Sequence, residues 1–97
     1  MEYTIHYSDT FDRWFRSLRD IRAKQRIKVR LDRILEGNFG DHKSVGQGVS
    51  ELRIPYGAGY RVYYTLRNNT VVLLLCGGDK ATQAQDIRQA QAMAGEL

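Results

Sequence analysis

The chain has 97 residues, 42% hydrophobic and 27% charged, which is typical of one globular domain and predicts a single domain over residues 1–97. Its single cysteine excludes a disulfide framework and a cysteine-based zinc site, and the lack of a leader or a long apolar run favours a cytoplasmic protein without a membrane partner. Fifteen Lys and Arg against eleven Asp and Glu give a net charge of +4, which favours nucleic acid, an anionic surface or an acidic protein as partner.

The N-terminal third of the chain predicts one strand followed by two helices. The segment Tyr3–Ser8 alternates and is rich in β-formers, and Ser8 or Asp9 can cap the helix that follows. A second helix begins near Arg22 and ends before Gly37. Nine basic residues against four acidic ones lie between residues 9 and 35. We therefore expect an antiparallel helical hairpin with an apolar inner face and an arginine-rich outer face.

The rest of the chain predicts a loop, three strands and a final helix. Four glycines among polar residues mark a loop over residues 37–48, and strands follow at residues 49–54, 60–67 and 70–76. Asn68 and Asn69 suit a tight hairpin turn, and the last strand is apolar on both faces, which is typical of a central strand. Gly77 and Gly78 break that strand, and Thr82 can cap the final helix.

The predicted order, β-α-α-β-β-β-α, indicates an α+β fold with helices on one face of a small, mostly antiparallel sheet. Strand alternation then places Arg53, Arg61 and Tyr63 together on the uncovered face. Lys80, just after the last strand, can join them. Three cations beside an aromatic ring predict an anion site of the kind that binds RNA, by charge for the phosphates and by stacking for a base.

Other polar residues are weaker candidates for function. Lys43 and Arg67 are further candidate RNA contacts, while Glu51, Asp86 and His42 are candidate proton donors or acceptors. Cys76 reads as a small buried apolar residue rather than a nucleophile. Neither metal-ligand spacing nor a cofactor motif is present in the sequence, so we expect no metal and no cofactor.

Several segments together resemble one known family. They are GAGYRVYYTLRNNTVVLLLCGGDKATQAQDIRQA, the earlier FDRWFRSLRD and LDRILEGNFGD, and VGQGVSELRI before the turn. This combination resembles the HigB-like, phage-derived branch of the RelE/ParE toxin superfamily. The resemblance implies a RelE-type fold and the toxin of a type II toxin–antitoxin system. It further implies a ribosome-dependent messenger RNA endonuclease that needs no metal and inhibits translation.

By the same resemblance, Arg61 matches the strand arginine that contacts the scissile phosphate, and Arg53 and Lys80 match basic residues of this branch. The chain departs from RelE at Glu51, where RelE carries a lysine, and it lacks the tyrosine near the C-terminal helix. The usual acid and base assignments therefore do not transfer. We expect Arg61 and Arg53 to hold the phosphate, and Lys80 to stabilise the developing charge or protonate the leaving oxygen. Glu51 or Asp86 is then the candidate acceptor for the 2′-hydroxyl proton.

The resemblance also implies the partners, which are a cognate antitoxin of the helix-turn-helix type, held in a hetero-oligomer, and the ribosome with its messenger RNA. Two alternatives stay open at this point. One is a ParE-like toxin that acts on DNA gyrase without catalysis. The other is a degenerate module that only binds an antitoxin and represses transcription.

Overall fold

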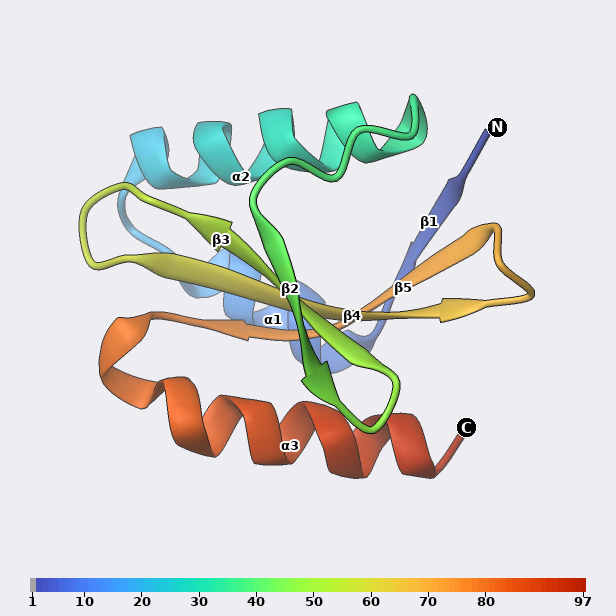
Figure 1. Ribbon diagram of the computed structural model, residues 1–97. Helices are drawn as coiled ribbons and strands as arrows, with labels where there is room; N and C mark the ends of the chain where they lie inside the picture. The colour runs from blue at the N-terminus through green and yellow to red at the C-terminus, as the bar shows by residue number, and fades with distance from the viewer. Residues whose placement is uncertain (1) are drawn as a thin grey trace.

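The computed structural model describes residues 2–97 and contains a five-stranded sheet with helices on both faces (Figure 1). None of the helices in this described part is long and apolar enough to cross a membrane. In chain order the elements are β1 (Thr4–Tyr7), α1 (Asp9–Ser17), α2 (Ile21–Leu35), β2 (His42–Gly46), β3 (Val49–Ile54), β4 (Tyr60–Arg67), β5 (Val71–Gly78), the 3-10 helix η1 (Lys80–Thr82) and α3 (Gln83–Gly95).

The two N-terminal helices begin and end where the sequence predicts. The Ser8 hydroxyl accepts a hydrogen bond from the Phe11 backbone N–H at 3.0 Å and caps α1. The Asp20 carboxylate accepts from the backbone N–H groups of Arg22 and Ala23 and caps α2. Gly37 follows α2 with a φ of 89°, a left-handed conformation that glycine adopts without strain.

The strands lie in the order β1-β5-β4-β3-β2, with β1 parallel to β5 and all other neighbours antiparallel. The apolar strand β5 is thus an interior strand, as predicted. Asn68 and Asn69 both have positive φ in the turn between β4 and β5. The predicted fold class, α+β with a helical hairpin on a mostly antiparallel sheet, is confirmed.

Each face of the sheet has its own apolar core. Helices α1 and α2 contribute Phe11, Ile27 and Ile34 to one core, which contains the inward residues of β3, β4 and β5. Helix α3 contributes Ala90 to a smaller core on the opposite face, packed with Val49, Tyr63, Leu75 and Cys76. In Figure 1, α2 and α3 lie on opposite sides of the sheet.

Three sequence expectations need correction. The prediction that all helices cover one face is wrong, because α3 covers part of the face that was expected to stay open and buries Tyr63 completely. The predicted loop over residues 37–48 contains an additional edge strand, β2, which pairs antiparallel with β3. In addition, β5 continues through Gly77 and Gly78, which were expected to break it.

Candidate functional site

Arg53 and Arg61 are direct cross-strand partners in β3 and β4, at the end of the sheet that α3 leaves uncovered. Directly opposed residues of an antiparallel pair project from the same face, so the two side chains are neighbours. A cleft of about 150 Å³ opens between them and the turn that joins their strands. The predicted pairing of these two arginines is therefore present, although at one end of a partly covered face rather than on an open one.

Arg61 is the more firmly held of the two. Its Nη1 donates to the Gly59 carbonyl at 2.9 Å, and its Nε lies 3.4 Å from Oε2 of Glu51. Its side chain is only 14% exposed. Among residues 2–97, its other terminal nitrogen, Nη2, forms no hydrogen bond, and this nitrogen is the one available to a ligand.

Glu51 is completely buried beneath this arginine. Its Oε2 accepts from the Tyr63 hydroxyl at 3.1 Å and from Nε2 of Gln83, on α3, at 2.8 Å. A carboxylate enclosed in this way orients its neighbours and has no access to a substrate hydroxyl. The expectation that Glu51 could accept the proton of a substrate is therefore not supported by its position, and its contacts make it a positioning residue for Arg61.

Tyr63 was expected to present its ring for base stacking, and that expectation is wrong. Its ring is fully buried between the sheet and α3, and its hydroxyl is committed to Glu51. Burial, followed by the negative charge of Glu51, raises the pKa of the Tyr63 phenol far above its ordinary value. Tyr63 thus belongs to the support beneath Arg61.

Arg53 has a partner that the sequence analysis missed. Its Nη2 lies 3.0 Å from Oδ1 of Asp41, in the segment before β2, and both side chains are partly exposed. The backbone carbonyl of Arg53 also accepts from Nη1 of Arg30 on α2. The only sequence signal for Asp41 is an acidic residue in a glycine-rich loop, which gives no indication of its distance from Arg53.

Lys80 lies beside Arg61, as predicted. Its backbone N–H donates to the Ala58 carbonyl at 3.3 Å, which ties η1 to the turn between β3 and β4. Gly59 lies between the base of the Lys80 side chain and the Arg61 guanidinium, because a Cβ there would lie 3.3 Å from the Lys80 Cβ and 3.5 Å from the Arg61 Nη1. The turn therefore brings Arg53, Arg61 and Lys80 to the same end of the sheet.

Asp86 lies on the first turn of α3 and accepts from the Thr82 hydroxyl at 2.6 Å. Its carboxylate rests against Gly78, which is the β5 partner of Arg61. Asp86 is only half-buried, so it stays a candidate proton acceptor at this end of the sheet.

Three further candidates lie outside the cluster or at its edge. Lys43 is exposed on β2 opposite Glu51 and shares the face of the arginines. His42 pairs with Leu52 and therefore belongs to the other face, where its ring contacts Phe39. Arg67 is at the far end of β4, six residues or about 20 Å along the strand from Arg61. The structure brings neither His42 nor Arg67 to the site.

The site also contains buried polar atoms that lack a hydrogen-bond partner. The buried polar atoms without a hydrogen-bond partner in residues 2–97 are Glu51 Oε1, Arg53 Nε and Arg61 Nε. Leaving such atoms unsatisfied costs stability. Within the same residues, no group of three or more His, Cys, Asp or Glu side chains is arranged to hold a metal ion.

Comparison with known proteins identifies the family to which the chain belongs. The model of the family described as phage derived protein Gp49-like matches residues 13–94. The chain belongs to this family. A relative from Haemophilus influenzae, described as an uncharacterized protein, is 54% identical over the whole chain and 98% of its own length.

Among solved structures, a double mutant of the Escherichia coli toxin RelE in the free state superposes with a TM-score of 0.75. The match covers 95% of this chain and 96% of RelE at 19% sequence identity. The intact E. coli RelBE toxin–antitoxin complex matches with a TM-score of 0.66 and 20% identity, over 79% of this chain and 95% of that one. The Gp49-like protein therefore has the RelE fold, so the predicted phage-derived family and the predicted RelE-type fold are both confirmed.

Proposed function

We propose that this Gp49-like protein is the toxin of a type II toxin–antitoxin pair and cleaves messenger RNA on the ribosome. The observation that carries the proposal is the pair of arginines, Arg53 and Arg61, that lines one small cleft, with Arg61 held from beneath by a buried carboxylate and Lys80 next to the same turn. Fixed cations of this kind stabilise the negative charge that develops on a phosphoryl group under attack.

The proposed reaction is attack by the ribose 2′-oxygen on the adjacent phosphorus. The new O2′–P bond forms while the P–O5′ bond breaks, so the products carry a 2′,3′-cyclic phosphate and a 5′-hydroxyl. The proton of the 2′-hydroxyl leaves to a base, and the departing 5′-oxygen receives one. Arg61 contacts the phosphoryl oxygens through its unpartnered Nη2, and Lys80 neutralises or protonates the leaving oxygen.

Arg53 and Asp86 take the remaining roles. The phosphate displaces Asp41 as the partner of Arg53, because the contact between Arg53 and Asp41 is partly exposed and therefore weak. We assign the role of proton acceptor to Asp86, because Glu51 is buried, His42 lies on the opposite face and the Asp86 carboxylate rests against the β5 partner of Arg61. A modest set of acid and base groups suits an enzyme whose substrate is aligned by the ribosome, because alignment itself lowers the barrier by several kcal/mol.

The proposed partners follow from the same function. The matching RelBE structure is a complex of a toxin with its antitoxin, and we extend that arrangement to this chain. The resemblance noted in the sequence adds an antitoxin of the helix-turn-helix type. A ribosomal target makes the cytoplasm the place of action. The alternative of a gyrase-directed, ParE-like toxin draws no support from the structures described above, which are of RelE.

The proposal is tested by sequencing RNA ends after purified protein is added to ribosomes that are translating a defined message. Wild type should generate 5′-hydroxyl ends, and Arg61→Ala should lower the cleavage rate by about 100-fold, as expected for loss of one preorganised donor. Arg88→Ala, which removes an exposed arginine of α3, is the matched control and should cleave like wild type. Absence of new ends with wild type, or equal rates for both variants, would refute the endonuclease.

A further inference from the structure

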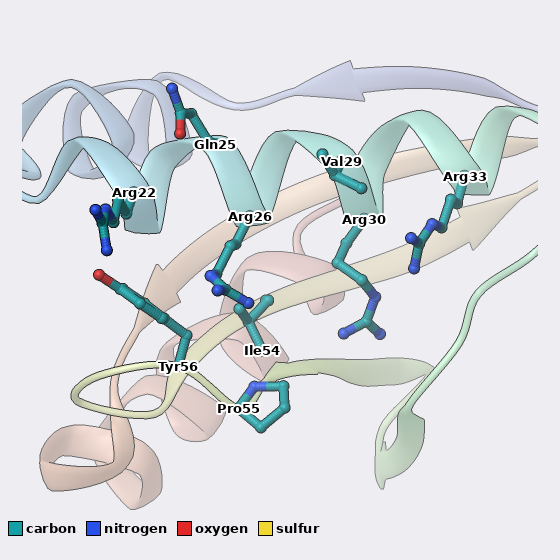
Figure 2. Close-up of a pocket in the computed structure, with 9 residues that line it drawn as sticks. All are labelled: Arg22, Gln25, Arg26, Val29, Arg30, Arg33, Ile54, Pro55 and Tyr56. Carbon is teal, nitrogen blue, oxygen red and sulfur yellow. The ribbon is translucent and has the colours of Figure 1, made fainter.

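A second basic surface lies on the other side of the sheet, along α2. Four arginines of this helix, Arg22, Arg26, Arg30 and Arg33, line a groove of about 520 Å³ whose opposite wall is formed by Pro55 and Tyr56. Figure 2 shows their side chains on one side of the helix, with Arg22 and Arg26 reaching toward Tyr56 and Pro55. We call this surface the α2 groove.

One of the four arginines is structural. Arg30 donates to three backbone carbonyls, those of Phe39, Asp41 and Arg53, and so fastens the segment before β2 to the end of β3. Burial lowers the pKa of its guanidinium, in keeping with a side chain that is partly buried. Arg30 builds the floor of the groove and is not available to a ligand.

The other three arginines are uncompensated. Arg22, Arg26 and Arg33 are exposed, and none of them forms an ion pair with a carboxylate anywhere in residues 2–97. Arginines four residues apart on a helix repel each other by a few tenths of a kcal/mol. A row of such charges is unfavourable in the free protein and is relieved by a polyanion that lies along the helix.

The geometry favours a phosphate backbone over bases. Arg22 and Arg33 are eleven residues apart, which is about 16 Å along the helix axis and spans several successive phosphates. The guanidinium of Arg26 already covers the Tyr56 ring at 4.7 Å from its centroid, and the Tyr56 hydroxyl donates to Asp20. The one aromatic ring of the groove is therefore occupied and does not offer a free face for a base.

We propose that the α2 groove is a second RNA-binding site, which holds the sugar–phosphate backbone of RNA through Arg22, Arg26 and Arg33 without reading its sequence. The choice of RNA as the polyanion rests on the proposed function. The α2 groove and the cleft between Arg53 and Arg61 share Ile54 and Pro55 as lining residues, so the two sites meet at the end of β3. Through this junction, RNA bound along α2 is held next to the cleaving cations.

The test compares two triple variants that remove the same charge. In one, Arg22, Arg26 and Arg33 are changed to Gln. In the other, Arg13, Arg19 and Arg88, which are exposed on other surfaces, are changed to Gln. The probe is a fluorescent twelve-nucleotide 2′-O-methyl RNA, which cannot undergo attack by a 2′-hydroxyl, and its affinity is measured by anisotropy across a salt series.

The groove variant should bind at least tenfold more weakly than wild type. The slope of its log K against log salt concentration should be smaller in magnitude by about two, as expected for three lost phosphate contacts on a single strand. The control variant should stay within about threefold of wild type at one salt concentration. The thermal unfolding midpoint of each variant is also measured, and a midpoint equal to that of wild type establishes that the variant is folded.

Two outcomes would overturn the proposal. One is an equal loss of RNA affinity in both triple variants, which would mean that net charge alone is responsible. The other is binding of a poly-glutamate peptide that depends on the groove arginines while RNA binding does not, which would assign the groove to an acidic protein. Because the probe cannot be cleaved, the affinity measurement tests the groove even if the endonuclease proposal fails. Equally, Arg61-dependent cleavage together with either of these outcomes overturns the groove proposal alone.

Discussion

At the scale of single residues, the site is organised around the fixed orientation of Arg61. The Gly59 carbonyl holds one end of its guanidinium and the Glu51 carboxylate lies against Nε, so that one terminal nitrogen is presented to the cleft. A preorganised cation needs no rearrangement as charge develops on a substrate, which is the main source of electrostatic catalysis. Glu51 in turn depends on Tyr63 and Gln83, so β3, β4 and α3 all determine where Arg61 points.

A pair of nearly isosteric substitutions separates positioning from stability. Glu51→Gln removes the charge beneath Arg61 but keeps an oxygen that accepts from Tyr63, so we expect cleavage to fall roughly tenfold with little change in substrate affinity. Tyr63→Phe keeps the carboxylate and loses one buried hydrogen bond, which should lower the free energy of unfolding by about 1 kcal/mol and leave cleavage near wild type. Single-turnover cleavage and urea unfolding measure the two effects. Parallel losses of both quantities in both variants would assign Glu51 a merely structural role.

The residue pattern predicts some of this site and not the rest. Alternation along β3 and β4, with the short turn between them, is sufficient to pair Arg53 with Arg61. The burial of Glu51 and Tyr63 is not predictable in this way, because the pattern assigns both to the arginine face without showing that α3 lies over part of it. Asp41 reaches Arg53 through the path of an irregular segment, which no periodicity encodes.

At the scale of elements, two consecutive glycines allow helices to approach the end of β5 from both sides. A Cβ on Gly77 would lie 2.3 Å from the Trp14 ring of α1, and a Cβ on Gly78 would lie 1.8 Å from the Asp86 carboxylate of α3. Successive strand residues face opposite sides of the sheet, so each glycine admits one helix. The glycines therefore have a packing role within the strand, whereas the sequence suggests only a strand break.

We expect Gly77→Ala to destabilise the protein by about 1–3 kcal/mol, the usual range for overpacking, because the Trp14 indole cannot retreat without moving α1. Gly95→Ala is the control, since a Cβ there meets nothing within 4 Å and alanine is the better helix former. It should leave stability unchanged or raise it by up to about 1 kcal/mol. Urea unfolding measures both variants, and a Gly77→Ala protein as stable as wild type would show that the close contact with Trp14 relaxes freely.

Elements with strong local signals are the ones that the sequence predicts correctly. The cap Ser8 and the turn at Asn68 and Asn69 act through local hydrogen bonds and backbone conformation, and each lies where expected. The edge strand β2 lacks such a signal. Most of its side chains are exposed, and its pairing with β3 is made by backbone groups that do not depend on which side chains it carries. The small residues of α3, such as Ala90, likewise do not indicate which face of the sheet the helix covers.

At the scale of the whole molecule, both faces of the sheet are covered and the basic residues are concentrated at one end and along α2. The coverage by α3 buries ionisable groups that an open sheet would leave in water. Burial raises the pKa of the Cys76 thiol to about 12, from an ordinary value of 9.0, and raises the pKa of the Tyr63 phenol as well. Both groups stay protonated in the folded protein at a pH where the unfolded chain would release its protons.

This difference makes the protein labile to alkali. Above about pH 9 the unfolded state binds fewer protons than the folded state, so the free energy of unfolding falls as the pH rises, by at most about 1.4 kcal/mol per pH unit for each group. Below that pH the stabilisation is fully present, and the thiol's share is lost as the pH rises toward 12. Urea unfolding between pH 8 and 11 measures the slope, which should be shallower in Cys76→Ala although that variant starts from a lower stability. Identical slopes would show that the thiol titrates alike in the folded and unfolded chains, and that the layer beneath α3 is open to water.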